Sequence, residues 1–351
     1  MASKRQAVKP TKKQPESETM LETLKTLTEA WGPSGYEHGV RAIIRRMVEP
    51  YADEITVDPL GNMICRVGKG GKKIMVAAHM DEIGLMVTFA EKKTGYLRFS
   101  PIGGLVNTAL LGSRVRFEDG TLGTLAMPEY FGAARTAAPA LDQYYVDVST
   151  GEGEPTIEPG MPAVFDRTME QRGSRVIAKA MDDRVGCVVA VEAMRRLKKR
   201  VQNEVYFVFT VQEEVGLRGA RPAAYSVDPD IGIALDVTPA GDMINVEKNE
   251  VRLGGGAAIK IHDTGLVVPP AIRDWMTRTA EREAIPYQRE LISLGTTDAA
   301  GMQIARAGVP SGAISIPCRY VHTPSETVDV NDVEACIALL AALVSAPVEL
   351  G

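Results

Sequence analysis

The chain has 351 residues, 45% of them hydrophobic and 24% charged, with a formal net charge of −5. This length supports one large domain or two smaller ones. Mixed charge argues against a nucleic-acid surface, and the lack of a long apolar stretch or signal-like N-terminus argues against a membrane protein. Four cysteines without a CxxC pair are typical of buried free thiols. We therefore expect a cytoplasmic protein.

The first predicted elements are a tail, two helices and three strands. Residues 1–18 carry five lysines and arginines and no apolar cluster, which predicts a disordered basic tail. Apolar residues then recur with helical spacing over 19–31 and 40–47. Strand-like runs follow at 54–57, 63–67 and 73–78. The third run is apolar throughout, which favours a buried strand, and it ends at His79.

The pattern of apolar and turn residues changes from about residue 85 to residue 165. Helical periodicity disappears, and short candidate strands alternate with turns rich in glycine and proline. These candidate strands are 97–100, 114–118 and 144–148. The pattern predicts a small all-β domain, 85–165, inserted into a larger domain formed by 19–84 and 166–351.

Long helical and strand patterns return after the insert. Helices are predicted at 182–199, 272–284, 299–307 and 333–344. Strands are predicted at 205–211, 231–235 and 313–316. This alternation predicts an α/β fold whose parallel or mixed sheet is covered by helices on both faces, in three layers. Sites in such sheets form at the carboxyl ends of strands, which is where His79, Glu213, Glu214 and Asp236 fall.

Five potential metal ligands each follow or end a hydrophobic run: His79, Asp182, Glu214, Asp236 and His322. Two histidines and three carboxylates suffice for two divalent ions if one carboxylate bridges them. Asp182 is the natural bridge because it begins a helix, whose dipole favours a carboxylate. The alternative is that Asp182 or Asp183 only caps this helix, and each histidine taken alone could be structural.

Two further acids suit supporting chemistry. Asp81, two residues after His79, could accept a hydrogen bond from the ring nitrogen that does not bind metal; the alternative is a surface acid in a turn. Glu213 and Glu214 are adjacent, so their side chains leave the backbone in different directions. One could bind metal while the other acts as general base on a water. The residues alone leave open which does which.

Six segments carry a family resemblance: GPSGYE, AAHMDEIGLMV, AKAMDDRVGC, QEEVGLRGA, ALDVT and YVHTPSE. In order and spacing they resemble the tetrahedral metallo-aminopeptidases, which include glutamyl and deblocking aminopeptidases and some members described as endoglucanases. The resemblance runs from about residue 21 to 344. It implies a catalytic α/β domain interrupted by a smaller β domain that serves dimerisation and assembly.

The resemblance also implies two divalent ions per subunit, most commonly zinc or cobalt. It implies that Asp182 is shared by both ions. His79 and Asp236 would complete the first ion's ligands, and Glu214 and His322 would complete the second's. It further implies that Glu213 is the general base and that Asp81 orients His79. Members form dimers that build a hollow dodecamer, which admits peptides rather than folded proteins.

Two segments add to this comparison. Residues 127–155 are rich in alanine and small residues, unlike the charged loop expected of the family. Residues 295–299 are similar to the family's turn near the substrate pocket, although a cap for the next helix explains them equally well.

The sequence therefore predicts an aminopeptidase that hydrolyses the N-terminal residue from peptides. The alternatives are a related two-metal amidohydrolase, such as a dipeptidase or deacylase, and a scaffold without activity. A glycosidase fits less well, because that reaction needs two facing carboxylates and no metal-binding histidines.

Overall fold

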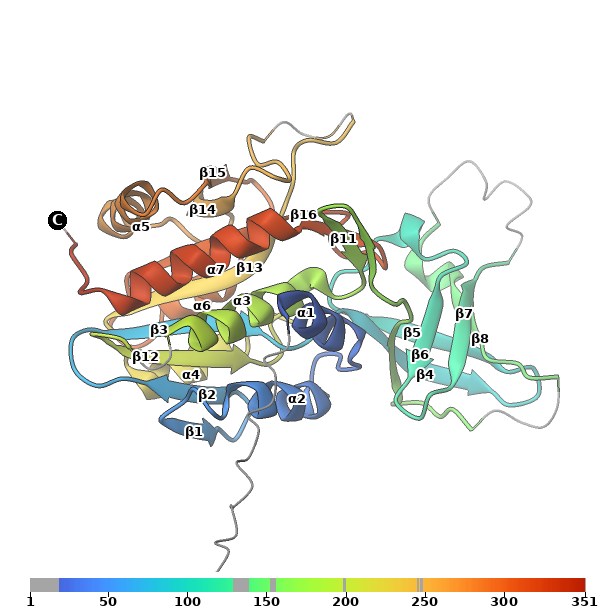
Figure 1. Cartoon of the computed structure of the whole chain (residues 1–351). Helices are drawn as coiled ribbons and strands as arrows, with labels where there is room; N and C mark the ends of the chain where they lie inside the picture. Colours follow the sequence, from blue (N-terminus) through green and yellow to red (C-terminus); the bar gives the residue numbers. More distant parts are fainter. Residues whose placement is uncertain are drawn as a thin grey trace, which may run out of the picture.

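The computed structural model describes residues 19–128, 139–151, 156–197, 200–244, 246 and 249–350. It contains an eleven-stranded mixed sheet covered by helices and, beside it, a closed six-stranded barrel (Figure 1). The predicted basic tail, 1–18, and parts of the segment 127–155 lie outside the described residues.

Four parallel strands form the centre of the large sheet: β12 (Glu204–Thr210), β3 (Lys73–His79), β13 (Ile231–Pro239) and β16 (Ser311–Arg319). They are buried along almost their whole length, as expected of apolar runs covered on both faces. Because all four run in the same direction, their carboxyl ends meet at one edge of the sheet.

Shorter strands extend the sheet on both sides. On the side of β12 these are β2 (Met63–Val67) and β1 (Glu54–Val57); beyond β16 they are β17 (Glu326–Asp329), β11 (Arg175–Ala178) and β10 (Glu170–Arg172). A parallel pair, β14 (Ala257–His262) and β15 (Tyr287–Leu291), attaches to β16 through β14. The β14–β15 pair is absent from the sequence prediction because charged residues interrupt both runs. Inside the fold, the Lys260 ammonium is buried between the carboxylates of Asp263 (3.0 Å) and Glu290 (2.7 Å).

Helices cover both faces of the sheet. In Figure 1, α3 (Met181–Leu197) and α7 (Val330–Ser345) lie in front of it, while α4 (Ala220–Val227) and α6 (Asp298–Gln303) lie behind. The remaining helices are α1 (Met20–Glu29), α2 (His38–Val48) and α5 (Pro270–Arg282). One continuous apolar cluster joins these helices to the sheet. The predicted three-layer α/β fold is confirmed.

The barrel has its own core and its own antiparallel ladder. Its strands are β4 (Gly84–Glu91), β5 (Tyr96–Ile102), β8 (Tyr145–Asp147), β7 (Leu122–Ala126), β6 (Arg114–Phe117) and β9 (Pro162–Phe165), in order around the barrel. Short 3₁₀ helices lie at Asn107–Ala109 and Leu141–Gln143. A separate apolar cluster fills the interior. The predicted small all-β insertion is confirmed.

Two expectations from composition can be compared with the structure. All four cysteines are buried and free, as predicted. Among the helices in the described ranges, none combines the length and apolarity needed to cross a membrane.

Candidate metal centre

The predicted site residues converge at the carboxyl edge of the four parallel strands. They come from the end of β3, the loop after β12, the body of β13, the start of α3 and the loop after β16. In that order these residues are His79, Glu213 with Glu214, Asp236, Asp182 and His322. Parallel strand direction brings together side chains that are separated by more than 240 positions in the chain.

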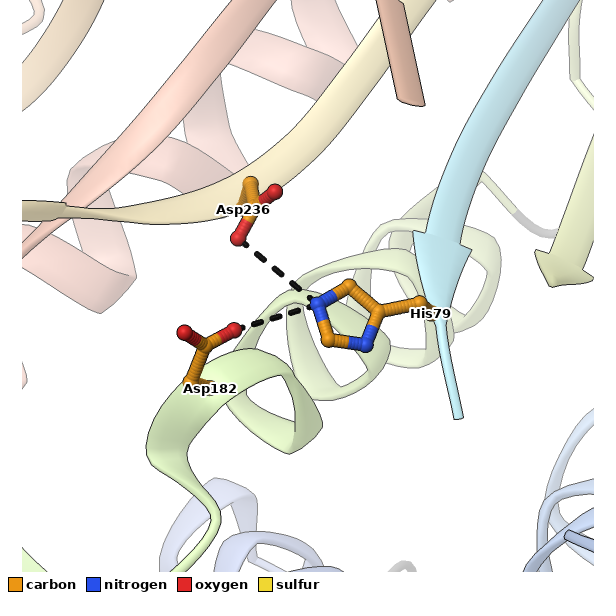
Figure 2. Close-up of side chains that lie close together, drawn as sticks. All are labelled: His79, Asp182 and Asp236. Carbon is orange, nitrogen blue, oxygen red and sulfur yellow. Dashed lines mark hydrogen bonds and ion pairs between the residues drawn. The ribbon is translucent and has the colours of Figure 1, made fainter. Parts of the chain in front are cut away.

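Asp182 lies between the two histidines. Its Oδ1 is 3.1 Å from Nε2 of His79, and its Oδ2 is 3.4 Å from Nε2 of His322. Figure 2 shows its carboxylate turned toward the His79 ring. Each oxygen of a single carboxylate thus faces a different imidazole, as a bridging ligand requires.

The ligand atoms fall into two groups that share Asp182. His79, Asp182 and Asp236 form one group, and Asp182, Glu214 and His322 form the other; within each, all ligand atoms lie within 4.8 Å of one another. In the first group, Nε2 of His79 lies 3.8 Å from Oδ1 of Asp236 (Figure 2). In the second, Nε2 of His322 lies 3.3 Å from Oε2 of Glu214. The arrangement has the form of two adjacent sites with a common carboxylate.

Of the two adjacent acids Asp182 and Asp183, it is Asp183 that caps the N-terminus of α3. Its Oδ1 accepts a hydrogen bond from the backbone N–H of Gly186 (3.0 Å) in the first turn of α3, and its Oδ2 accepts one from the backbone N–H of His79 (3.2 Å). Asp182 itself has a non-helical backbone, with ψ of 109°. Its side chain is therefore free of the helix end and available to the histidines.

Asp81 contacts several groups that surround the centre. Its side chain is fully buried, which excludes an exposed acid in a turn, and its Oδ1 lies 3.4 Å from Nδ1 of His79. The same carboxylate accepts hydrogen bonds from the backbone N–H groups of Glu213 (3.0 Å) and Glu214 (3.2 Å) and from the hydroxyl of Ser34 (2.6 Å). Asp81 thus contacts the loop that presents the two glutamates and one histidine ring, whose Nδ1 also lies 3.1 Å from the backbone oxygen of Asp81.

Four of the eight non-glycine residues with a positive φ angle in the described ranges lie around this centre. Positive φ angles occur at Ala180 (53°), Gln212 (55°), Tyr320 (61°) and His322 (64°). Such a conformation costs a non-glycine residue about 1–3 kcal/mol and persists where surrounding contacts hold it. Three loops that present site residues therefore carry strained backbone.

Carboxylates outnumber cations in the centre. Burial raises the pKa of Glu213 well above its usual value. His79 lowers this pKa in part, and the nearby carboxylate of Asp236 raises it further. Burial alone would lower the pKa of His322, but hydrogen bonds to Asp182 and Glu214 outweigh it and raise this pKa to about 12. Each histidine is thus held between acids that favour a positive charge at its position.

The residues fit a pair of divalent ions. Oε1 of Glu214 is buried and has no hydrogen-bond partner among the described residues, which is costly unless a cation is its partner. Imidazole nitrogens and carboxylate oxygens are a donor set that zinc, cobalt and manganese accept. The exposed fraction of the side chain rises from 2% at His79 to 32% at His322, so the centre opens toward His322.

The turn at 295–299 contains both a helix cap and a buried acid near the centre. The hydroxyl of Thr297 caps α6 by accepting from the backbone N–H of Ala299 (3.3 Å). Asp298 accepts a hydrogen bond from the hydroxyl of Thr210 (2.5 Å), at the end of β12, and burial raises its pKa to about 6. The cap explains the threonine, and the contact with β12 explains the aspartate.

An ion network missed by sequence reasoning holds the loop after β3. The carboxylate of Glu82 contacts Nζ of Lys179 at 2.7 and 2.8 Å and a guanidinium nitrogen of Arg184 at 3.3 Å. Arg184 also donates to the backbone oxygens of Met80 (2.6 Å) and Gly32 (3.1 Å). All three charged side chains are buried. A sequence signal was present, because these three charges lie in the HMDE and KAMDDR segments beside predicted site residues.

Replacing Glu82 with Gln is expected to lower the free energy of unfolding by about 3–5 kcal/mol, because it leaves two buried cations without their counter-ion. Urea unfolding followed by circular dichroism measures the change. Glu283→Gln is the matched control, since that carboxylate pairs with Arg282 at the surface and about half of its side chain is exposed (46%). Equal midpoints for the two variants would contradict a structural role for the network.

Known proteins resemble this chain over nearly its whole length. Residues 61–339 match the sequence profile of the M42 glutamyl aminopeptidase family. A lysyl aminopeptidase of Pyrococcus furiosus is 37% identical over 340 residues, covering 92% of this chain and 96% of the relative. The structure of an aminopeptidase from the archaeon Desulfurococcus kamchatkensis superposes with a TM-score of 0.88 at 40% identity, covering 94% of this chain and 96% of the other.

A third similar protein is described by its assembly. The TET1 peptidase of Pyrococcus horikoshii superposes with a TM-score of 0.83 at 31% identity, covering 93% of this chain and 99% of the other, and it can assemble into a tetrahedron or a large octahedral shell. Profile, relatives and structures agree with the resemblance seen in the sequence, and the chain belongs to the M42 glutamyl aminopeptidase family.

Proposed function

We propose that this peptide hydrolase is an aminopeptidase that releases the N-terminal residue of peptides with the help of two divalent ions. The observation that carries the proposal is the position of Asp182, whose two oxygens face His79 and His322 at 3.1 and 3.4 Å. A carboxylate shared between two ligand groups is the feature that distinguishes a paired centre from a single metal site.

The residues of the two groups would hold the ions. Asp182 is the bridge, His79 and Asp236 complete one position, and Glu214 and His322 complete the other. Among the ions that these ligands accept, the family resemblance favours zinc or cobalt. Ions bound there supply Lewis acidity, which lowers the pKa of a water and polarises a scissile carbonyl.

Glu213 is the general base of the proposal. It belongs to neither ligand group, yet its Oε2 lies 3.9 Å from Nε2 of His79, at the border of the centre. Burial and neighbouring acids raise its pKa, which brings the affinity of this carboxylate for protons closer to that of an efficient base at neutral pH. Its carboxylate takes a proton from the attacking water and delivers it to the leaving amine. Asp81 keeps Glu213 in place by accepting a hydrogen bond of 3.0 Å from its backbone N–H.

We further propose that the chain works as a cytoplasmic homo-oligomer, with dimers that build a dodecamer through the β-barrel domain. Support comes from the barrel's separate core and from the shells formed by the similar TET1 peptidase. Such a shell would admit peptides and exclude folded proteins. Light scattering of the purified chain tests this, and a monomer would contradict it.

The reaction is tested with matched peptides, one with a free N-terminus and one N-acetylated. Mass spectrometry of the digest should show stepwise loss of single residues from the free peptide only. Release of the acyl group would indicate a deacylase, and hydrolysis confined to dipeptides would indicate a dipeptidase. Either result would overturn the proposal.

Replacing His322 with Ala is expected to release one of the two ions and leave the other bound, because only the second ligand group contains this ring. Metal analysis after gel filtration measures the change. His38→Ala is the control, since that ring is 59% exposed and pairs with Glu118 away from the centre. A His322→Ala protein that still holds two ions would remove His322 from the ligand set.

A further inference from the structure

Glu326, a buried acid outside the ligand groups, contacts the backbone of two of their members. Its Oε1 accepts a hydrogen bond from the backbone N–H of His322 (2.8 Å), and its Oε2 accepts one from the backbone N–H of Asp182 (3.1 Å). We propose that Glu326 is a positioning residue that sets the spacing between the bridging ligand and the histidine of the second ion. The inference rests on the proposed two-metal centre.

The fold places this carboxylate between the two loops that it joins. Glu326 begins β17, where it is paired with Ala178 at the end of β11, and the next residue, Thr327, is paired with Arg319 at the end of β16. The chain leaves β11 toward Asp182 and leaves β16 toward His322. One side chain at the start of β17 therefore reaches both loops at the point where they separate.

Both loops need an external support, because both are strained. Ala180, two residues before Asp182, has a φ of 53°, and His322 itself has a φ of 64°. Strained conformations of this kind persist only where contacts determine them. Glu326 accepts one hydrogen bond from each loop, from His322 in one and from Asp182 in the other.

Both oxygens of Glu326 are occupied by these backbone groups, so its action on an ion is indirect. Asp81 makes equivalent contacts with another loop, since its carboxylate accepts hydrogen bonds from the backbone N–H groups of Glu213 and Glu214. The second ligand group consists of Asp182, Glu214 and His322. Two buried carboxylates, Asp81 and Glu326, thus position all three ligands of that group through their backbone.

The test is the isosteric change Glu326→Gln. An amide has one acceptor oxygen and one donor nitrogen, so one of the two backbone N–H groups must lose its partner whichever way the amide is turned. We expect the affinity for the second Zn²⁺ to fall about 10- to 100-fold, the usual effect of removing a supporting hydrogen bond at a metal site. Calorimetric titration of the metal-free protein with Zn²⁺ measures both binding steps without reference to activity.

Asp332→Asn is the matched control. Asp332 is also a buried carboxylate, and it accepts from two backbone N–H groups, those of Gly254 and Gly256, at 2.7 Å each, but it contacts no ligand. Both variants should unfold at lower urea concentrations than the parent protein. Only Glu326→Gln should weaken the second Zn²⁺. A second variant, Glu326→Asp, keeps the charge and both oxygens but is one methylene shorter, and it should also bind this ion more weakly.

The outcomes separate the inference from the function on which it rests. If Glu326→Gln and Glu326→Asp bind the second Zn²⁺ as tightly as the parent, or if Asp332→Asn weakens it equally, Glu326 is not a positioning residue. His322→Ala serves as the reference. If that variant loses one ion while the Glu326 variants do not, only the positioning role fails; if it keeps both ions, the proposed ligand set fails as well.

Discussion

Replacing Glu213 with Gln is expected to lower turnover by about 10²- to 10⁴-fold while both metal ions remain bound. The amide has nearly the same shape as the carboxylate but does not accept a proton from the attacking water. Since Glu213 belongs to neither ligand group, the change leaves the metal ligands intact. The measurement is kcat on an aminoacyl anilide together with metal content on the same preparation.

The neighbouring acid gives the control for this experiment. Glu214→Gln should lose metal, because Glu214 belongs to the second ligand group and its Oε2 lies 3.3 Å from the His322 ring. The two substitutions should therefore have different effects: Glu213→Gln should lower turnover alone, and Glu214→Gln should lower metal content. If Glu213→Gln kept full turnover, or if it lost an ion, the general-base assignment would be wrong.

The second large effect is expected at Asp182, where Asp182→Ala should abolish the binding of both ions. This is the only side chain common to the two ligand groups among the described residues, and the only one there with an oxygen facing each histidine. Its removal leaves each group with two ligands, His79 with Asp236 in one and Glu214 with His322 in the other. Metal analysis should find neither ion, and activity should be absent at any zinc or cobalt concentration tested.

Asp183→Ala is the control for that change. Asp183 is the adjacent buried acid and caps α3 through the backbone N–H of Gly186. Loss of a cap costs about 0.5–2 kcal/mol of stability, and Asp183 also accepts a hydrogen bond from the backbone N–H of His79. This variant should therefore unfold more easily and bind the first ion more weakly, but it should keep the second ion. If Asp182→Ala retained one ion at full occupancy, the carboxylate would not be the bridge.

Much of the fold could be predicted because its strands are simple apolar runs. The strand that ends at His79 and the strand that contains Asp236 are buried along nearly their whole length, and such segments are recognisable without a structure. Parallel strands then bring their carboxyl ends together, which is why acids and histidines separated along the chain could be assigned to one site. The segment with short strands and frequent turns likewise corresponds to the barrel.

Other features could not be predicted because they depend on contacts that residue types alone do not reveal. The strand that contains Lys260 becomes recognisable only when Asp263 and Glu290 are seen to neutralise the ammonium. The link from Glu326 to Asp182 joins residues 144 positions apart through a backbone N–H, a contact that residue type does not reveal. The choice between Asp182 and Asp183 as helix cap required the hydrogen bond that Asp183 accepts from the backbone N–H of Gly186.

We propose that one chain holds two divalent ions and uses them to remove an N-terminal residue. The most direct test titrates Zn²⁺ or Co²⁺ into the metal-free protein and measures aminopeptidase activity at each step. We expect two equivalents of bound metal per chain and full activity only when both are bound. Full activity with one ion or none would contradict it.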